Sequence, residues 1–299
     1  MNILVLGANG QLGQAVKAAS TEAKSHYIFS DVYTGDDSRM LNIDITSLSA
    51  LREIVQREHI NVIVNCAAYT NVEKAEDDIE NARKLNKDAV KNIAIVAKEN
   101  DATLIHITTD FVYDGKKAAP YQEGDEKNPQ SAYAITKYEG EQEIINTGCK
   151  YILFRTAWMF SEYGNNFMKT MIRLTSEREH LNVVYDQVGT PTYAPELAKL
   201  IVKVIEENML HMTGEYNFSN EGSVSWYDFA VAINRACGHH CDISSISSEA
   251  YGSKVKRPSF SVLDKSKVKK TFGIKIPHWL DSLDEGIKAY KKLRDFRIS

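Results

Sequence analysis

Short apolar runs alternate with amphipathic helical patterns along the first half of this 299-residue chain, and this alternation restricts the fold more than any other feature. The runs are apolar along most of their length rather than at every second position, which is typical of strands covered on both faces. They lie at residues 3–6, 27–29, 62–65, 103–107 and 151–154, and the helical patterns lie at 11–19, 48–58, 82–98 and 133–145. This alternation predicts an α/β fold with a doubly wound parallel sheet.

The pattern becomes irregular after about residue 156. The remainder contains helical patterns at 195–207 and 226–236 among short extended pieces. A chain of this length suits one large domain or two interleaved ones. We therefore predict a first domain over residues 1–155 and a smaller α/β region over 156–299, which binds the substrate and is partly interleaved with the first.

Composition and charge exclude several classes of protein. The 36 Lys and Arg residues stand against 40 Asp and Glu residues, so the net charge is -4 and no basic face suggests a nucleic-acid partner. No apolar run approaches the length of a membrane span, and the N-terminal run is too short for a secretory signal. Four unevenly spaced cysteines predict no disulfide framework, so we expect a cytoplasmic protein.

The segment Cys237-Gly-His-His-Cys241 is the one candidate metal site in the sequence. Cysteine and histidine are the ligands that zinc prefers. No second Cys/His pair at zinc spacing occurs elsewhere, and the segment follows a helical pattern as its last turn would. We predict no metal at this place or elsewhere.

Three glycines follow the first predicted strand, in Gly7-Ala-Asn-Gly10-Gln-Leu-Gly13, and a helical pattern begins there. Glycines at such a turn let the backbone approach a pyrophosphate, and the helix N-terminus offers unpaired N–H groups to it. This context predicts a dinucleotide site on a Rossmann domain, although a turn that only packs helix on strand has the same composition. Asp31 ends the second strand, where an acid binds the adenosine ribose and favours NAD over NADP. Arg39 and Lys24 are near enough in sequence to keep NADP open.

Two further segments are predicted to contact the cofactor. Asp44 and Ile45 lie in NIDIT, where Asp44 either approaches the adenine or caps a helix. Ala67, Ala68 and Tyr69 leave the strand at 62–65, and small residues there let the backbone lie against a cofactor. Core packing alone is the alternative for these three.

Tyr133 and Lys137 are four residues apart in a helical pattern and therefore share one face. An ammonium beside a phenol favours the phenolate, so we expect Lys137 to lower the pKa of Tyr133 and make it a usable acid or base. Tyr113 and Lys117 have the same spacing, but Gly115 lies between them and the flanks are not helical. The pattern favours Tyr133 for the chemistry.

The stretch TTDFVYDG follows an apolar run and so lies at the carboxyl end of a predicted strand. Ligands of open parallel sheets bind at these ends. A hydroxyl there can hydrogen-bond a carbonyl oxygen that becomes negative as hydride arrives. We expect that hydroxyl to be Thr109, because Thr108 still belongs to the strand.

Thr109, Tyr133 and Lys137 resemble the Ser/Thr-Tyr-Lys triad of the extended short-chain dehydrogenase/reductase superfamily. Six segments resemble one family in it, the dTDP-4-dehydrorhamnose reductases, and stand in that family's order: NCAAYTNVEKAE, TTDFVYDG, YAITKYEGE, RTAWMF, DQVGTPTYAPELA and RPSFSVLD. The resemblance covers nearly the whole chain. It implies reduction of the C4 keto group of dTDP-4-dehydro-β-L-rhamnose to dTDP-β-L-rhamnose by NADPH or NADH, the last step of dTDP-rhamnose synthesis in bacteria.

The resemblance also implies residue roles. Tyr133 would donate the proton, Thr109 would polarise the carbonyl, and Lys137 would bind the nicotinamide ribose. By position, Gln11 and Leu12 would lie on the phosphate turn, and Asp110 and Trp158 at the sugar. Arg257 is the candidate for the diphosphate, because a guanidinium matches phosphate geometry. Core packing is the alternative for Trp158, and a surface position before proline is the alternative for Arg257. One departure is Phe111 and Tyr113, where many relatives have Tyr and then Phe.

Two other functions remain open at this point. One is a different nucleotide-sugar reductase, epimerase or dehydratase, although dehydratases carry Asp-Glu after the threonine and here Phe111 follows Asp110. The other is a non-catalytic, NADP-binding regulatory subunit on the same fold. The expected partner is a dTDP-sugar, with no nucleic acid and no membrane, and a homodimer is compatible with the sequence.

Overall fold

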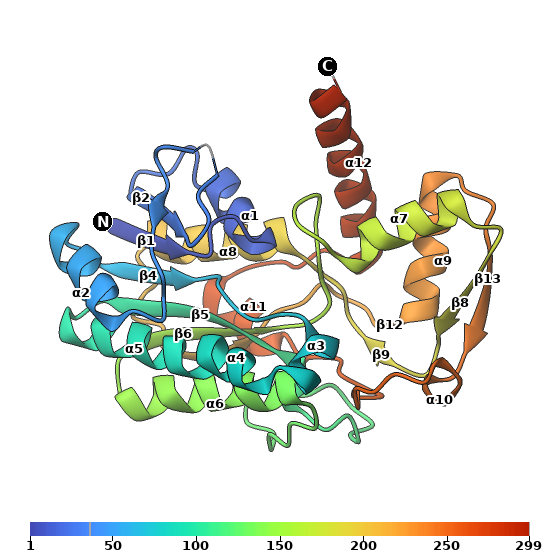
Figure 1. The fold of residues 1–299 in the computed structure, drawn as a ribbon, viewed down its shortest axis with the longest axis horizontal. Helices are drawn as coiled ribbons and strands as arrows, with labels where there is room; N and C mark the ends of the chain where they lie inside the picture. Colours follow the sequence, from blue (N-terminus) through green and yellow to red (C-terminus); the bar gives the residue numbers. More distant parts are fainter. Residues whose placement is uncertain (36, 299) are drawn as a thin grey trace.

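A seven-stranded parallel sheet with helices on both faces forms the larger part of the molecule (Figure 1). The computed structural model describes residues 1–35 and 37–298. The strand order is β11-β6-β5-β4-β1-β2-β3, which confirms the predicted doubly wound α/β fold. The strands are β1 (Asn2–Leu6), β2 (His26–Asp31), β3 (Leu41–Asn42), β4 (Val62–Asn65), β5 (Thr103–Thr109), β6 (Lys150–Thr156) and β11 (Gly214–Asn217).

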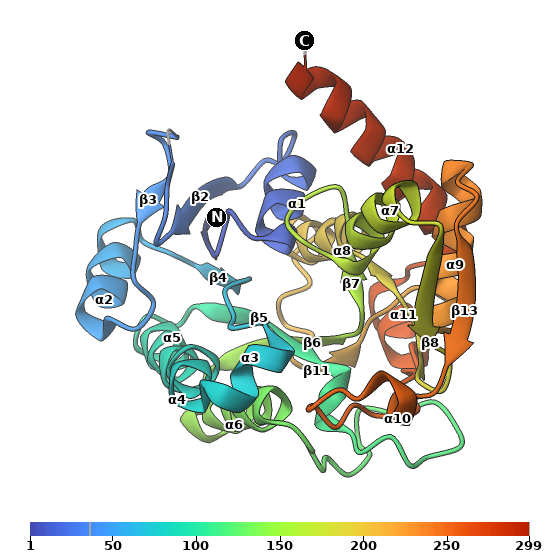
Figure 2. The same cartoon turned by 45° about the vertical axis from the view of Figure 1, so that its right-hand side comes forward.

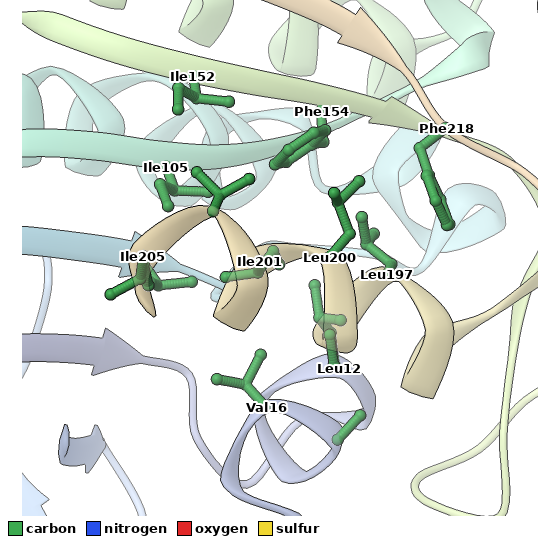
Figure 3. Packing of buried hydrophobic residues seen from close by; sticks show 14 of the residues in the cluster. Leu12, Val16, Ile105, Ile152, Phe154, Leu197, Leu200, Ile201, Ile205 and Phe218 are labelled. Carbon is green, nitrogen blue, oxygen red and sulfur yellow. The ribbon is translucent and has the colours of Figure 1, made fainter. Parts of the chain in front are cut away.

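Successive residues of each central strand face opposite layers of helices, which explains why the strands are apolar throughout. Ile3 and Val5 of β1 belong to the core layer that contains side chains of α1 (Gln11–Ala19), α8 (Ala194–Glu206) and α11 (Ser266–Phe272). Leu4 and Leu6 belong to the opposite layer, which contains side chains of α2 (Leu48–Arg57), α5 (Ala89–Glu99) and α6 (Ala132–Thr147). Figure 3 shows the first layer, where Leu197, Leu200 and Ile201 of α8 lie between the sheet and Leu12 and Val16 of α1. A strand that is covered on both faces is therefore mostly apolar.

The helical pattern at 82–98 is not one regular helix. It comprises the end of α4 (Ile79–Arg83), a π-helical turn η1 (Lys84–Asp88) and α5. The wider turn places the Asn86 side chain between the segment after β4 and helix α6. Its Nδ2 donates to the carbonyl of Tyr69 at 3.1 Å and to Thr136 Oγ1 of α6 at 3.2 Å. A short helix, α3 (Val72–Asp77), precedes α4.

Part of the sheet comes from the C-terminal half of the chain. Strand β11 pairs with β6 in parallel, and α8 covers the sheet beside α1. These elements lie beyond residue 155, where the sequence analysis divided the chain, and they show how far the two halves are interleaved. The division itself stays a prediction.

The remaining elements form a smaller lobe at the carboxyl ends of the strands, at the right of Figures 1 and 2. Its short sheets pair β7 (Met159–Phe160) with β10 (Thr192–Tyr193), β9 (Val188–Gly189) with β12 (Val224–Ser225), and β8 (His180–Val184) with β13 (Asp242–Ile246). Its helices are α7 (Phe167–Glu177), α9 (Trp226–Cys237), α10 (Ser248–Tyr251) and α12 (Trp279–Ile298), the last of which projects from the body (Figure 2). Across residues 1–35 and 37–298, none of the helices has both the length and the apolar character needed to cross a bilayer.

Candidate active site

A cleft of about 790 Å³ lies at the carboxyl ends of the sheet strands, between the sheet and the smaller lobe. It brings together most residues that the sequence analysis singled out. Those that line it are Gly7, Gly10, Gln11, Leu12, Asp31, Ile45, Ala67, Ala68, Thr109, Asp110, Tyr133, Lys137, Trp158 and Arg257. Gly13, Asp44 and Tyr69 do not line it.

The turn between β1 and α1 has room for backbone only. Gly7 has a φ of 74°, and a Cβ added to it would lie 2.6 Å from Ala67 N. A Cβ on Gly13 would lie 2.3 Å from the carbonyl oxygen of Gly7, so Gly13 lets α1 pack against the turn without reaching the cleft. The N-cap of α1 is Gly10, and no side chain caps the helix. The first-turn N–H groups are therefore open to an anion at this end of the cleft.

Asp31 occupies the edge of the cleft at the end of β2. Its Oδ2 accepts a hydrogen bond from Asn9 N at 3.0 Å and its Oδ1 accepts one from Tyr33 N at 3.3 Å. These two bonds fix the carboxylate where an adenosine ribose would lie in a doubly wound fold. Arg39 pairs with Asp37, and neither Arg39 nor Lys24 lines the cleft.

Asp44 and Tyr69 are bonded to neighbouring residues outside the cleft lining. Asp44 Oδ1 accepts bonds from Thr46 N and Thr46 Oγ1, and these bonds lower the pKa of its carboxyl. The helix N-cap alternative for Asp44 is wrong, because the Ser47 side chain caps α2. The hydroxyl of Tyr69 donates to Asp78 Oδ2 at 3.1 Å. A cofactor contact by Asp44 or Tyr69 therefore stays a prediction.

Thr109, Tyr133 and Lys137 meet at the base of the cleft. Thr109 is the last residue of β5, and its Oγ1 accepts a hydrogen bond from Phe111 N at 3.2 Å. Tyr133 lies in the first turn of α6, which the Ser131 side chain caps. Lys137, one turn further, donates from Nζ to the carbonyl oxygen of Ile107 at 2.8 Å. A strand end and a helix start thus present a hydroxyl, a phenol and an ammonium to one space.

Burial determines the protonation of this group. It raises the pKa of Tyr133 to about 12, against a hydrogen bond with Thr109 that lowers it. It lowers the pKa of Lys137 to about 8, and the charge of Glu141 opposes this shift. The expectation that Lys137 lowers the pKa of Tyr133 is wrong in this structure, because desolvation of the phenol dominates. At neutral pH Tyr133 keeps its proton, which is the form that a proton donor needs.

Asp110 follows Thr109 and is buried beside it. Burial raises the pKa of its carboxyl to about 7, and hydrogen bonds with Ser261 and Thr109 oppose the shift. Its Oδ1 accepts a bond from Thr109 Oγ1 at 3.2 Å, while its Oδ2 finds no partner of hydrogen-bond geometry among the described residues. A carboxyl with a pKa of about 7 exists in both forms at neutral pH, and its protonated form can donate as well as accept a hydrogen bond.

The predicted substrate residues Trp158 and Arg257 line the opposite wall. Trp158 stacks on Trp226 of α9, which the sequence analysis missed. Arg257 donates from Nη2 to Glu73 Oε1 of α3 at 2.8 Å, so a contact with a diphosphate requires this pair to separate or to share the guanidinium. Arg257 could be singled out from the sequence because its guanidinium matches a phosphate, whereas Trp226 carried no signal beyond its place at a helix start.

The second Tyr-x3-Lys pair lies outside the cleft. Tyr113 is buried, and its hydroxyl donates to the carbonyl of Gln122 at 2.9 Å. Lys117 forms an ion pair with Asp125. The two side chains therefore serve different partners. Within the described ranges, no three His, Cys, Asp or Glu side chains are grouped to hold a metal ion, and this includes the segment from Cys237 to Cys241.

The family model, the curated relatives and the solved structures that are similar to this chain all match it over nearly its full length. A family model described as "RmlD substrate binding domain" matches residues 1–292. The dTDP-4-dehydrorhamnose reductase of Aggregatibacter actinomycetemcomitans is 35% identical over 297 residues, which is 96% of this chain and 98% of the relative.

Two solved structures are similar in fold and in sequence. A dTDP-4-dehydrorhamnose reductase from Clostridium acetobutylicum has a TM-score of 0.90 and 39% identity, covering 97% of this chain and 100% of the other. The enzyme of the same name from Bacillus anthracis, solved in complex with NADP, has a TM-score of 0.85 and 32% identity, covering 96% and 98%.

Proposed function

The chain belongs to the RmlD substrate binding domain family, in agreement with the resemblance of its six segments, and from this premise we propose how its cleft works as a dTDP-4-dehydrorhamnose reductase that uses NADPH or NADH. The enzyme reduces the C4 keto group of dTDP-4-dehydro-β-L-rhamnose to the hydroxyl of dTDP-β-L-rhamnose, which completes dTDP-rhamnose synthesis. The observation that supports the proposal most directly is the meeting of Thr109, Tyr133 and Lys137 in the cleft that also holds the open glycine turn.

The residues present fit a nicotinamide dinucleotide. The space beside Gly7 is too narrow for a side chain, and the first turn of α1 leaves its N–H groups open for a pyrophosphate. Asp31 is held by its backbone hydrogen bond at the edge of the cleft, where it would accept hydrogen bonds from the ribose hydroxyls, and the small residues Ala67 and Ala68 line the cleft wall. When bound, the reduced cofactor supplies the hydride.

The protein supplies the proton and stabilises developing charge. The Thr109 hydroxyl, which donates to Asp110 Oδ1 in this structure, turns to donate its hydrogen bond to the keto oxygen as negative charge grows there. Tyr133, which is protonated at neutral pH, then transfers its phenolic proton to that oxygen. The ammonium of Lys137, which lines the same cleft, binds the nicotinamide ribose and so orients the cofactor toward the keto carbon. Asp110 and Trp158 orient the sugar. Arg257 gives up its hydrogen bond to Glu73 and binds the diphosphate of the substrate instead.

The alternatives predict different chemistry. A dehydratase needs a second acid–base group next to Asp110, and Phe111 stands there with its ring edge toward Tyr133 at a centroid distance of 6.0 Å. An epimerase returns its hydride and shows no net cofactor oxidation. A regulatory subunit binds NADPH without turnover.

The test follows the absorbance of NADPH as purified protein meets dTDP-4-dehydrorhamnose, and identifies the product by mass spectrometry. Stoichiometric oxidation that requires the sugar nucleotide, with a product two hydrogens heavier, supports the reductase. Cofactor binding without oxidation would contradict it, and would favour the epimerase if an epimer appears or the regulatory subunit if no sugar changes.

Asp31 is proposed to set the choice between NADH and NADPH. A 2′-phosphate would meet its carboxylate, whereas the ribose hydroxyls of NADH would bind it. Asp31→Asn keeps the shape and removes the charge, so we expect it to lower KM for NADPH and to raise KM for NADH. Arg39→Gln is the matched control, because Arg39 lies outside the cleft. Equal changes for both cofactors would contradict this role.

We further propose that the protein works in the cytoplasm and that its partner is the dTDP-sugar alone. The four cysteines are unpaired, as in a reducing compartment. A homodimer is compatible with this assignment. Light scattering of the purified protein measures its oligomeric state, and fractionation of cells measures its location.

A further inference from the structure

Glu141 lies on the catalytic face of α6. The positions of Tyr133, Lys137 and Glu141 are each four residues apart, so the three side chains follow one line along the helix. Glu141 is 1% exposed. A carboxylate buried to this degree is destabilising unless other groups satisfy it.

Two strands satisfy this carboxylate. Its Oε1 accepts a hydrogen bond from Thr108 Oγ1 at 2.5 Å, and its Oε2 accepts one from Arg155 Nη2 at 2.8 Å. Thr108 of β5 and Arg155 of β6 are direct partners in the sheet register. One side chain of α6 therefore joins the helix to the carboxyl ends of two neighbouring strands, next to Thr109.

Alternating charges continue from Glu141 to the surface. Arg155 is fully buried and also donates to Glu215 Oε2 of β11 at 3.1 Å. Glu215 in turn lies 3.5 Å from Lys127 Nζ. Each charge in this network therefore lies beside an opposite charge, and the Glu141 carboxylate is paired independently of Lys137.

We propose that Glu141 is a positioning residue of the reductase, whose carboxylate keeps Lys137 charged and holds α6 against the ends of β5 and β6. This inference rests on the proposed function. Lys137 is 2% exposed, and an ammonium in such a place needs a nearby negative charge to keep its proton. Glu141 is the group that raises the pKa of Lys137 against the effect of burial.

The other ionisable groups around this pair do not supply the charge. His106 of β5 faces Lys137, and burial lowers the pKa of its imidazole well below the usual value, so it is neutral. Among the described residues, the groups that face Glu141 are Arg155 and Tyr151 of β6 and Tyr113, while Glu215 of β11 is paired with Arg155 and Lys127. Burial raises the pKa of both tyrosines, so they too are neutral.

The variant that tests the inference is Glu141→Gln, which keeps the shape and removes the charge. The first readout is the affinity for NADPH as a function of pH, measured by fluorescence without the sugar nucleotide. We expect its alkaline limb to move to lower pH by about one unit, because Lys137 loses its proton more easily. The alkaline limb of kcat/KM is expected to move in the same direction.

Two variants separate charge from structure. Glu139→Gln is the matched control on the same helix, because Glu139 pairs with Arg83 at 2.8 Å away from the cleft, and its profile should match the wild type. Thr108→Val removes the hydrogen bond to Glu141 and keeps the charge. It should lower kcat and leave the alkaline limb in place.

An unshifted limb in folded Glu141→Gln would overturn the inference. If that variant does not fold, the double variant Glu141→Gln with Arg155→Met removes both buried charges and leaves no unpaired guanidinium. The same shift is expected there, and its absence would also overturn the inference. Failure of the proposed function would look different, since NADPH would bind with the expected pH dependence but never be oxidised.

Discussion

The indole rings of Trp158 and Trp226 stack face to face, with centroids 3.5 Å apart and planes at 9°. Trp158 has a φ of 45°, a left-handed conformation that is strained for a bulky residue. A Cβ on Gly189 would lie 2.7 Å from the Trp158 ring, so β9 must carry glycine there. Trp226 and Gly189 together hold Trp158 in the cleft wall in a conformation that it would not adopt alone.

Removal of this stack should weaken sugar binding before it affects chemistry. In Trp226→Ala, Trp158 loses its support, and we expect KM for the sugar nucleotide to rise by up to about tenfold. The affinity for NADPH should not change. Trp279→Phe is the control, since Trp279 packs edge-on against Phe229 instead. Steady-state kinetics measure the effect, and a fall in kcat with constant KM would contradict it.

Tyr133→Phe should abolish most turnover and preserve cofactor binding. Only the transferable proton is removed, so kcat should fall by ~10²–10⁴-fold. The control is Tyr138→Phe on the same helix, a residue that does not line the cleft. NADPH titration and the oxidation assay measure both properties. Near-normal turnover by Tyr133→Phe would overturn its assignment as the proton donor.

The buried carboxyl of Asp110 should make stability depend on pH. Its folded pKa of about 7 lies above the ordinary value of 3.8, so the folded state binds the proton more tightly than the unfolded state. The free energy of unfolding therefore includes a contribution from Asp110 that is fully present below pH 3.8. This contribution falls by on the order of 4 kcal/mol as the pH rises to about 7. The Asp110→Asn variant has no carboxyl to titrate, so its free energy of unfolding should not show this fall with pH. Urea unfolding of both proteins at several pH values tests it, and parallel pH profiles would refute it.

Gly140 permits the closest approach between α6 and the π-helical turn. A Cβ there would lie 2.1 Å from the carbonyl oxygen of Asn86, which is backbone and cannot turn aside. Gly140→Ala should therefore destabilise the fold by about 3 kcal/mol and reduce turnover, because α6 carries Tyr133 and Lys137. At Gly124 no atom lies within 4 Å of the added Cβ, so Gly124→Ala should be neutral. Equal unfolding midpoints for the two variants would contradict this account.

The parallel sheet could be predicted from the sequence because its strands are buried on both faces, so apolar runs are distinct there. The two-residue strand β3 and the short strand β11 could not, since Glu215 and Asn217 interrupt the apolar pattern of β11 to reach Arg155. The π-helical turn also escaped prediction, because only Asn86 and its distant partners favour it.

The triad could be predicted because Tyr133 and Lys137 stand at helical spacing and Thr109 at a strand end. The pKa of Tyr133 could not, since it depends on how deeply the phenol is buried. Glu141 was overlooked because a glutamate within a helix usually faces water. Its spacing from Lys137 was visible, but the burial that gives the spacing meaning comes from the sheet.

The late position of β11 in the chain also affects how the protein is made. Glu215 follows Arg155 by 60 residues, so a ribosome completes β6 several seconds before the strand that pairs with it. During that interval β6 is an open sheet edge, and Arg155 lacks one of its carboxylates. Nascent chains stalled before residue 214 would therefore expose the unpaired backbone groups of β6, which can pair with strands of other chains. A chaperone that covers this edge during the interval would prevent such aggregation.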